Sequence, residues 1–231
     1  MAQRDLKAQA RDFAAEISEL LNGTVTQGIR LGAVVAVGGT TLVGRGITVR
    51  NFTPETIPLC IGGRQPRLWL RVAFILSLDD EGQYLTVTKS DYSICLDEDG
   101  ANVLAHYDYD RAPVNEYPSA HLQVNGANEG LADLFSQTDN AGKLLGHLHF
   151  PVGGKRFRPT LEDVVEFLIV EGLLDGHDGW EAQVADHRQR WEELQLRAAV
   201  RRDPEAARAQ LTAMGYAVTP PPEKPKRRGK R

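Results

Sequence analysis

Residues 31–124 alternate short apolar runs with tight turns, and this pattern constrains the fold more than any other feature of the sequence. The strongest strand-like runs are residues 67–78, 84–96, 102–110 and 119–124. Two turns between them, residues 79–82 and 97–100, are acidic and end in glycine. Such turns are typical of hairpins, because glycine readily adopts the left-handed backbone that they need. We therefore expect an antiparallel meander.

Helical spacing of apolar residues appears on both sides of this region. It predicts a first helix over residues 4–21 and C-terminal helices over residues 161–172, 179–200 and 204–214. Thr160 and Asp163 have the spacing of a capping box at the start of a helix. The fold class predicted is α+β, an antiparallel sheet meander with an N-terminal helix and a helical C-terminal extension.

Composition changes along the chain suggest three parts. We expect an α+β core domain over residues 1–175, a helical extension over 176–216 and a disordered basic tail over 217–231. The last thirteen residues carry six basic side chains against one acidic one, so the rest of the chain is more acidic than its net charge of −4. The tail is therefore the part expected to contact nucleic acid, or else to aid solubility.

The location expected is cytoplasmic. No apolar run approaches the roughly 18 residues of a membrane span, so no membrane partner is expected. The N-terminal stretch is charged and amphipathic and does not resemble a secretory signal. Cys60 and Cys95 both lie in strand-like runs, which predicts buried free thiols in a reducing compartment.

Polar side chains that could carry chemistry gather in the last predicted strands. Residues two apart in a strand share a face, so His106, Asp108 and Asp110 are expected on one face, with Tyr107 and Tyr109 on the other. A further predicted strand over residues 145–150 would place His147 and His149 together, and it follows a predicted helix over 129–137. His121 lies on the strand before them.

Three interpretations of these histidines remain open. His147 and His149, completed by His121 or Asp108, form a weak metal-binding pattern. Alternatively, two histidines share proton transfer, while Lys155, Arg156 and Arg158 near a helix start hold a phosphate. In the third interpretation the histidines are ordinary polar residues on a solvent-exposed face. No dinucleotide-binding glycine pattern, Walker lysine or nucleophile elbow occurs, so no cofactor is expected.

Four segments together resemble the small TumE-type toxins of bacterial toxin–antitoxin pairs. They read YSICLDEDG (92–100), HYDYDR (106–111), SAHLQV (119–124) and RPTLEDVVEFL (158–168). The positions matched to that family are Tyr107, Asp108 and His121; the family usually has arginine where His106 stands and more than one histidine near His121. The resemblance implies a growth-inhibiting protein, acting as a ribonuclease beside an antitoxin partner.

These observations lead to one functional prediction and one alternative. The prediction is a toxin-like or defence-associated protein that cleaves RNA without a metal, with His121 as general acid or base and Asp108 orienting a neighbour. His149 is the second proton carrier in this prediction. The alternative is a non-catalytic binding module, in which the acidic sheet meets a protein partner and the helix carrying Trp180 and Trp191 docks.

Overall fold

The computed structural model describes residues 6–36, 39–60, 65–114, 117–126, 144–152 and 158–219. The chain divides into two compact units, residues 1–185 and 186–231. The predicted helix over 129–137, Lys155, Arg156 and the tail from residue 220 lie outside the described residues.

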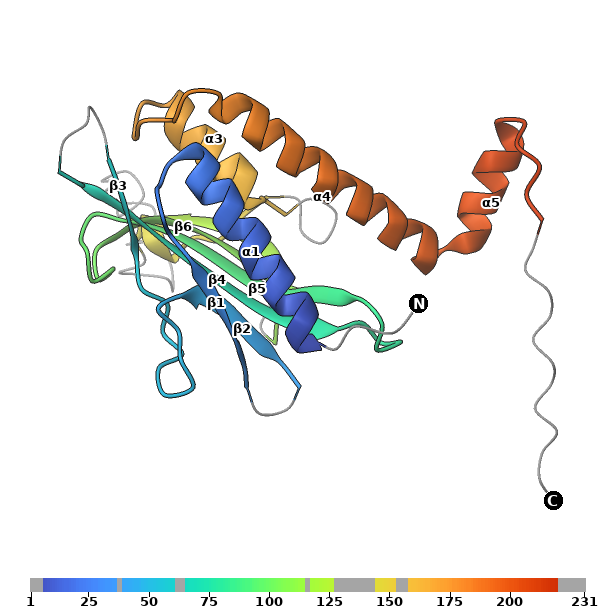
Figure 1. The fold of residues 1–231 in the computed structure, drawn as a ribbon, viewed down its shortest axis with the longest axis horizontal. Helices are drawn as coiled ribbons and strands as arrows, with labels where there is room; N and C mark the ends of the chain where they lie inside the picture. Colours follow the sequence, from blue (N-terminus) through green and yellow to red (C-terminus); the bar gives the residue numbers. More distant parts are fainter. Residues whose placement is uncertain are drawn as a thin grey trace, which may run out of the picture. The chain divides into compact units, whose positions relative to one another are not determined.

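The first unit is built on one antiparallel sheet, which confirms the predicted α+β meander (Figure 1). Its strands are β1 (Leu31–Val35), β2 (Thr41–Arg45), β3 (Ile57–Leu59), β4 (Leu68–Leu78), β5 (Leu85–Cys95), β6 (Val103–Asp110), β7 (Ala120–Val124) and β8 (Phe150–Pro151). They lie in the order β1-β2-β4-β5-β6-β7-β8, and β3 also pairs with β4. From β4 to β7 each strand therefore pairs with the next one along the chain.

The acidic turns close the hairpins as their sequences predict. Gly82 and Gly100 both have positive φ, at 68° and 72°. In the turn before β5, Asp79 Oδ1 accepts from the N–H groups of Gln83 and Tyr84 at 2.7 and 3.1 Å. In the next turn the Asp97 carboxylate accepts from the N–H of Asn102. Side-chain acceptors and glycine conformation thus cooperate to reverse the chain at these points.

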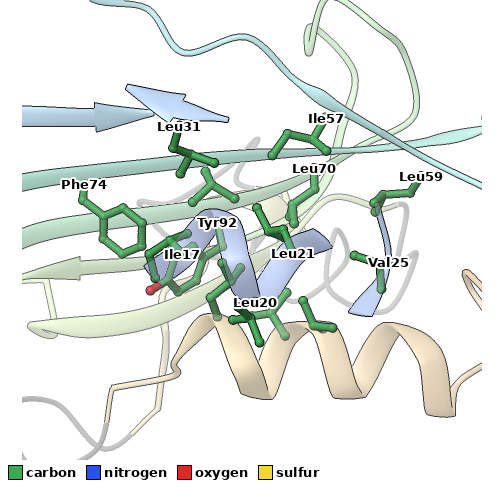
Figure 2. Packing of buried hydrophobic residues seen from close by; sticks show 14 of the residues in the cluster. Ile17, Leu20, Leu21, Val25, Leu31, Ile57, Leu59, Leu70, Phe74 and Tyr92 are labelled. Carbon is green, nitrogen blue, oxygen red and sulfur yellow. The ribbon is translucent and has the colours of Figure 1, made fainter. Parts of the chain in front are cut away.

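Helices α1 (Leu6–Thr24) and α3 (Leu161–Val170) contribute to the core on one face of the sheet. Burial in β4 alternates, with the side chains of even-numbered residues from Leu68 to Leu76 buried. Figure 2 shows Leu20 and Leu21 of α1 among Leu70 and Tyr92 of the sheet. Because strand side chains alternate, this packing leaves the odd-numbered positions of β4 on the opposite face.

Helix α3 begins where the sequence predicts. The Thr160 side chain accepts from the N–H of Asp163, and the Asp163 carboxylate accepts in turn from the N–H of Thr160 at 2.9 Å. This reciprocal capping satisfies N–H groups that a helix start leaves without partners. Helix α4 (Trp180–Arg202) begins in the first unit, where Trp180 and Val184 pack into the core.

The second unit contains the rest of α4 and α5 (Pro204–Ala213). Asp203 caps α5 by accepting from the N–H of Ala206 at 2.9 Å. This unit exposes several large apolar side chains, namely Leu194, Leu196, Val200, Leu211, Met214 and Tyr216. Along α4, Val184 is therefore buried, whereas Leu194 is exposed.

Two local predictions are wrong. Residues 145–150 do not form one strand: Leu145–His147 is a 3-10 helix, η1, and only Phe150–Pro151 pairs with β7. Gln123 Nε2 donates to the carbonyl of Gly146 at 2.9 Å, which holds η1 against the end of β7. Cys60 is exposed, whereas Cys95 is buried as expected.

We predict that Leu70→Ala destabilises the protein by about 2–5 kcal/mol, because Leu70 is fully buried in the central strand and truncation leaves a cavity. Urea unfolding followed by circular dichroism measures the loss. Leu196→Ala, at an exposed position, is the matched control and should change the free energy of unfolding by no more than about 0.5 kcal/mol. Equal losses in the two variants would contradict the assignment of the core.

Candidate active site

The strand register places a set of polar side chains on the face of the sheet opposite the helices, here called the polar face. Directly opposed residues on neighbouring strands share a face. Asp91 of β5 opposes Asp108 of β6, and Asp108 opposes His121 of β7. In the neighbouring row Ser93 opposes His106, and His106 opposes Gln123. Two rows of ionisable and polar groups therefore cross three adjacent strands.

Asp108 lies at the centre of these rows. Its Oδ2 is 3.5 Å from Nε2 of His121 and 3.8 Å from Nε2 of His106. The His121 and His149 rings have centroids 4.7 Å apart, and His149 stacks on Tyr117 at 3.6 Å. His106 and His121 thus lie on either side of Asp108, and His149 lies against His121. We call Asp91, His106, Asp108, His121 and His149 the Asp–His cluster.

Hydrogen bonds determine the orientation of His121. Nδ1 of His121 lies 3.0 Å from the carbonyl oxygen of Pro118. A carbonyl only accepts, so Nδ1 carries a proton and Nε2, facing Asp108, bears the lone pair in the neutral ring. The residue is only 8% exposed, so its surroundings hold this orientation.

His106 is oriented in a similar way by Gln123. Gln123 Nε2 donates to the carbonyl of Gly146 at 2.9 Å, which directs Oε1 toward His106. That oxygen lies 2.6 Å from Nε2 of His106, so Nε2 is the donor. Both histidines beside Asp108 thus have a defined tautomer, one through a backbone carbonyl and the other through an amide.

Asp91 and Asp108 are an unfavourable pair, because like charges directly opposed across strands repel. Burial, followed by the negative charge of Asp108, raises the pKa of Asp91 from 3.8 to about 6. Ser93 donates to Asp91 Oδ1 at 2.8 Å, and Arg71 Nε lies 3.7 Å from the same oxygen. These contacts hold the Asp91 carboxylate in place, but they only partly oppose the rise in its pKa that burial and Asp108 cause.

Lys89 and Asp110 form the next row of the polar face. Lys89 Nζ lies 2.7 Å from Asp110 Oδ2. Burial raises the pKa of Asp110, but the hydrogen bonds from Lys89 and from the N–H of Ala112, with the Lys89 charge, outweigh it and lower the pKa. This pair therefore behaves as an ordinary ion pair, unlike Asp91 and Asp108.

All members of the cluster except His106 line a pocket of about 460 Å³, whose wall includes Asp91, Asp108, Tyr117, His121 and His149. A volume of this order suits a small ligand or part of a larger one. A second hollow of about 470 Å³ lies beside α1, and its wall contains no histidine or aspartate. The first pocket therefore combines space with groups that can move protons.

Two residues predicted for the site lie on the other face of the sheet. Tyr107 packs against the hydrophobic core, and burial, followed by the charge of Asp163, raises its pKa. The Arg158 guanidinium lies 5.0 Å from the centre of the Tyr109 ring, on the helix-covered side. The sheet therefore separates both residues from the polar face. Of the predicted site residues, the structure brings together His121, Asp108 and His149.

Other residues of the site were missed or misplaced by sequence reasoning. Asp91 was missed, although Lys89, Asp91 and Ser93 alternate on one face of a predicted strand. Tyr117 was missed because it lies in a loop without periodicity. The metal interpretation based on His147 and His149 sharing a strand face is wrong, since His147 lies in η1 and its Nδ1 accepts from the N–H of Leu144.

We predict that Asp91→Asn stabilises the metal-free protein at neutral pH relative to the wild type. Folding favours the protonated form of Asp91. The contribution of this residue to the free energy of unfolding is therefore fully present below about pH 4, and it is lost as the pH rises through about 6. Asparagine does not titrate, so the difference should grow by up to about 3 kcal/mol between pH 4 and pH 7.

Urea unfolding with a chelator at several pH values measures this difference. Asp110→Asn is the control: the pKa of Asp110 is lowered, so this variant should lose stability relative to the wild type as the pH rises from about 2 to 5. If the difference in free energy of unfolding between Asp91→Asn and the wild type does not change with pH, the burial and repulsion assigned to this carboxylate are contradicted.

No family model matches the chain, and no significant match was found among curated proteins or solved structures. The resemblance to TumE-type toxins therefore stays a prediction. No helix in the part of the chain that the structure describes is long and apolar enough to cross a membrane.

Proposed function

We propose that this protein is an enzyme that cleaves RNA inside a bacterial cell by acid–base chemistry at the Asp–His cluster. The observation that carries the proposal is the placement of His121, His149 and Asp108 in the wall of one pocket. In this site His121 and His149 are the two proton carriers. Asp108 is a positioning residue, which attracts the His121 ring when Nε2 carries a proton.

The geometry suits acid–base cleavage of RNA in three respects. The His121 tautomer is defined by the Pro118 carbonyl, so one nitrogen is directed into the cluster. The His149 ring lies close to that of His121, so that a base and an acid can act on one reacting group. Tyr117, stacked on His149, offers an aromatic surface near the pocket, and nucleic-acid bases stack well on such surfaces.

The choice of RNA comes from the resemblance to TumE-type toxins, as does an antitoxin partner. In RNA the 2′-hydroxyl is the nucleophile: one histidine removes its proton as the oxygen bonds to the adjacent phosphorus. The bond from phosphorus to the 5′-oxygen breaks, and the second histidine protonates that departing oxygen. Of the predicted phosphate-binding residues, Arg158 lies across the sheet, and Lys155 and Arg156 lie outside the described residues. Asp91 and Asp108 line the pocket and repel an anionic substrate, so a cation at this site would favour substrate binding.

We predict that induced expression of the wild type stops growth of a bacterial host and degrades RNA, whereas His121→Gln does neither. Loss of a general acid or base lowers the rate by about 10²–10⁴-fold. Growth curves and electrophoresis of total RNA measure the effect, with circular dichroism as the check of folding.

His177→Gln is the matched control, because His177 lies in the loop before α4, where its N–H donates to the carbonyl of Thr24 in α1, and it does not line the pocket. This variant should remain toxic. The proposal is wrong if folded His121→Gln degrades RNA as the wild type does. It is also wrong if neither the wild type nor the control affects growth or RNA.

The second candidate function is that of a protein-binding module, which the exposed apolar residues of the second unit favour. Leu196 is 66% exposed, and Met214 and Tyr216 are each 61% exposed. Where such side chains form one contiguous patch, they are typical of interaction surfaces. In that case Leu196→Asp would remove the cellular effect and His121→Gln would leave it, the opposite of the result expected for an enzyme.

A further inference from the structure

We propose that Asp91, Asp108 and His106 bind a first-row divalent cation on the polar face, beside His121. One oxygen from each carboxylate and one ring nitrogen of His106 lie within 4.8 Å of one another. Ligand atoms about 2.0–2.2 Å from a metal lie about 3–4.4 Å apart, so small side-chain rotations complete such a site. The three residues come from adjacent strands, whose paired backbones hold the ligands in register.

The donor types indicate which cations the site takes. Two carboxylates with an imidazole suit manganese, iron, cobalt or zinc, whereas calcium and magnesium prefer oxygen ligands alone. The hydrogen bond between His106 and Gln123 resembles the outer contacts that orient histidine ligands. If the metal binds Nε2, it replaces this hydrogen bond; if it binds Nδ1, the bond remains as support.

The charges around these ligands favour a cation at the same place. Asp91 and Asp108 are opposed on adjacent strands, with Arg71 beside Asp91 as a partial counter-charge. Opposed like charges destabilise a sheet, and a cation between them converts this repulsion into attraction.

The role given to this cation rests on the proposed function. A bound divalent cation would cancel the charges of Asp91 and Asp108, so that they no longer repel an anionic substrate, and its remaining coordination positions would accept a substrate oxygen. It would therefore provide the contact to the substrate that Arg158, across the sheet, does not. His121 remains the proton carrier and is not a ligand, which makes the metal site and the acid–base site separable by mutation.

We predict that the metal-free full-length protein binds Mn²⁺ at one site, as measured by calorimetric titration and by loss of the free Mn²⁺ electron paramagnetic resonance signal. Asp91→Asn, Asp108→Asn and His106→Gln should each weaken binding at least about tenfold, since each removes a direct ligand. His121→Gln should bind Mn²⁺ as the wild type does while losing RNA cleavage.

Asp110→Asn is the matched control, because Asp110 lies on the same face but pairs with Lys89. Loss of the Asp110 charge should change the affinity for Mn²⁺ by less than about twofold, as expected for a screened charge outside the site. An equal loss in Asp110→Asn and Asp91→Asn would show diffuse attraction to an acidic face and overturn the proposal. So would unchanged binding in His106→Gln, or weakened binding in His121→Gln.

Binding and cleavage are measured separately, so the two proposals can fail independently. Mn²⁺ binding with the expected variant pattern, but no RNA cleavage, supports the metal site and overturns the nuclease. Cleavage that depends on His121 and persists with a chelator, without Mn²⁺ binding, supports the nuclease and overturns the metal site.

Discussion

The packing of α1 and α3 against the even-numbered side chains of β4 determines the arrangement of the whole first unit. Leu70 and Val72 belong to the core that these helices share with the sheet. Because β4 to β7 pair in antiparallel register, the buried side of β4 also sets which side of β5, β6 and β7 is buried. The opposite side of these strands is left for polar groups, and the Asp–His cluster forms there.

Strand register also explains why the site contains a repulsive pair of carboxylates beside side chains that hydrogen bonds hold in one orientation. Register alone forces Asp91 and Asp108 to face each other, although their charges repel. Around them, Ser93, Gln123 and the Pro118 carbonyl hold the carboxylate and the two rings in single orientations. A repulsive pair that is held in place by neutral hydrogen bonds, beside a pocket, is more typical of a functional site than of a stabilising one.

The two units differ in how their apolar residues are used. In the first unit, apolar side chains of the helices and the sheet meet in one core (Figure 2). In the second, Leu196, Met214 and Tyr216 are exposed, and its ion pairs join neighbours along one helix, such as Arg197 with Glu193 at 3.4 Å. Exposed pairs of this kind add little stability.

Local sequence determined the antiparallel meander, the hairpin turns at Gly82 and Gly100, the capping of α3 and the faces of His106, Asp108 and Tyr107. These features follow from side-chain alternation, turn chemistry and capping, all of which act over a few residues. Tertiary structure alone decided that Asp91 opposes Asp108, that His147 turns away in η1, and that Arg158 lies across the sheet from His121. These outcomes depend on strand register and on contacts between residues far apart in the chain, and no local pattern encodes them.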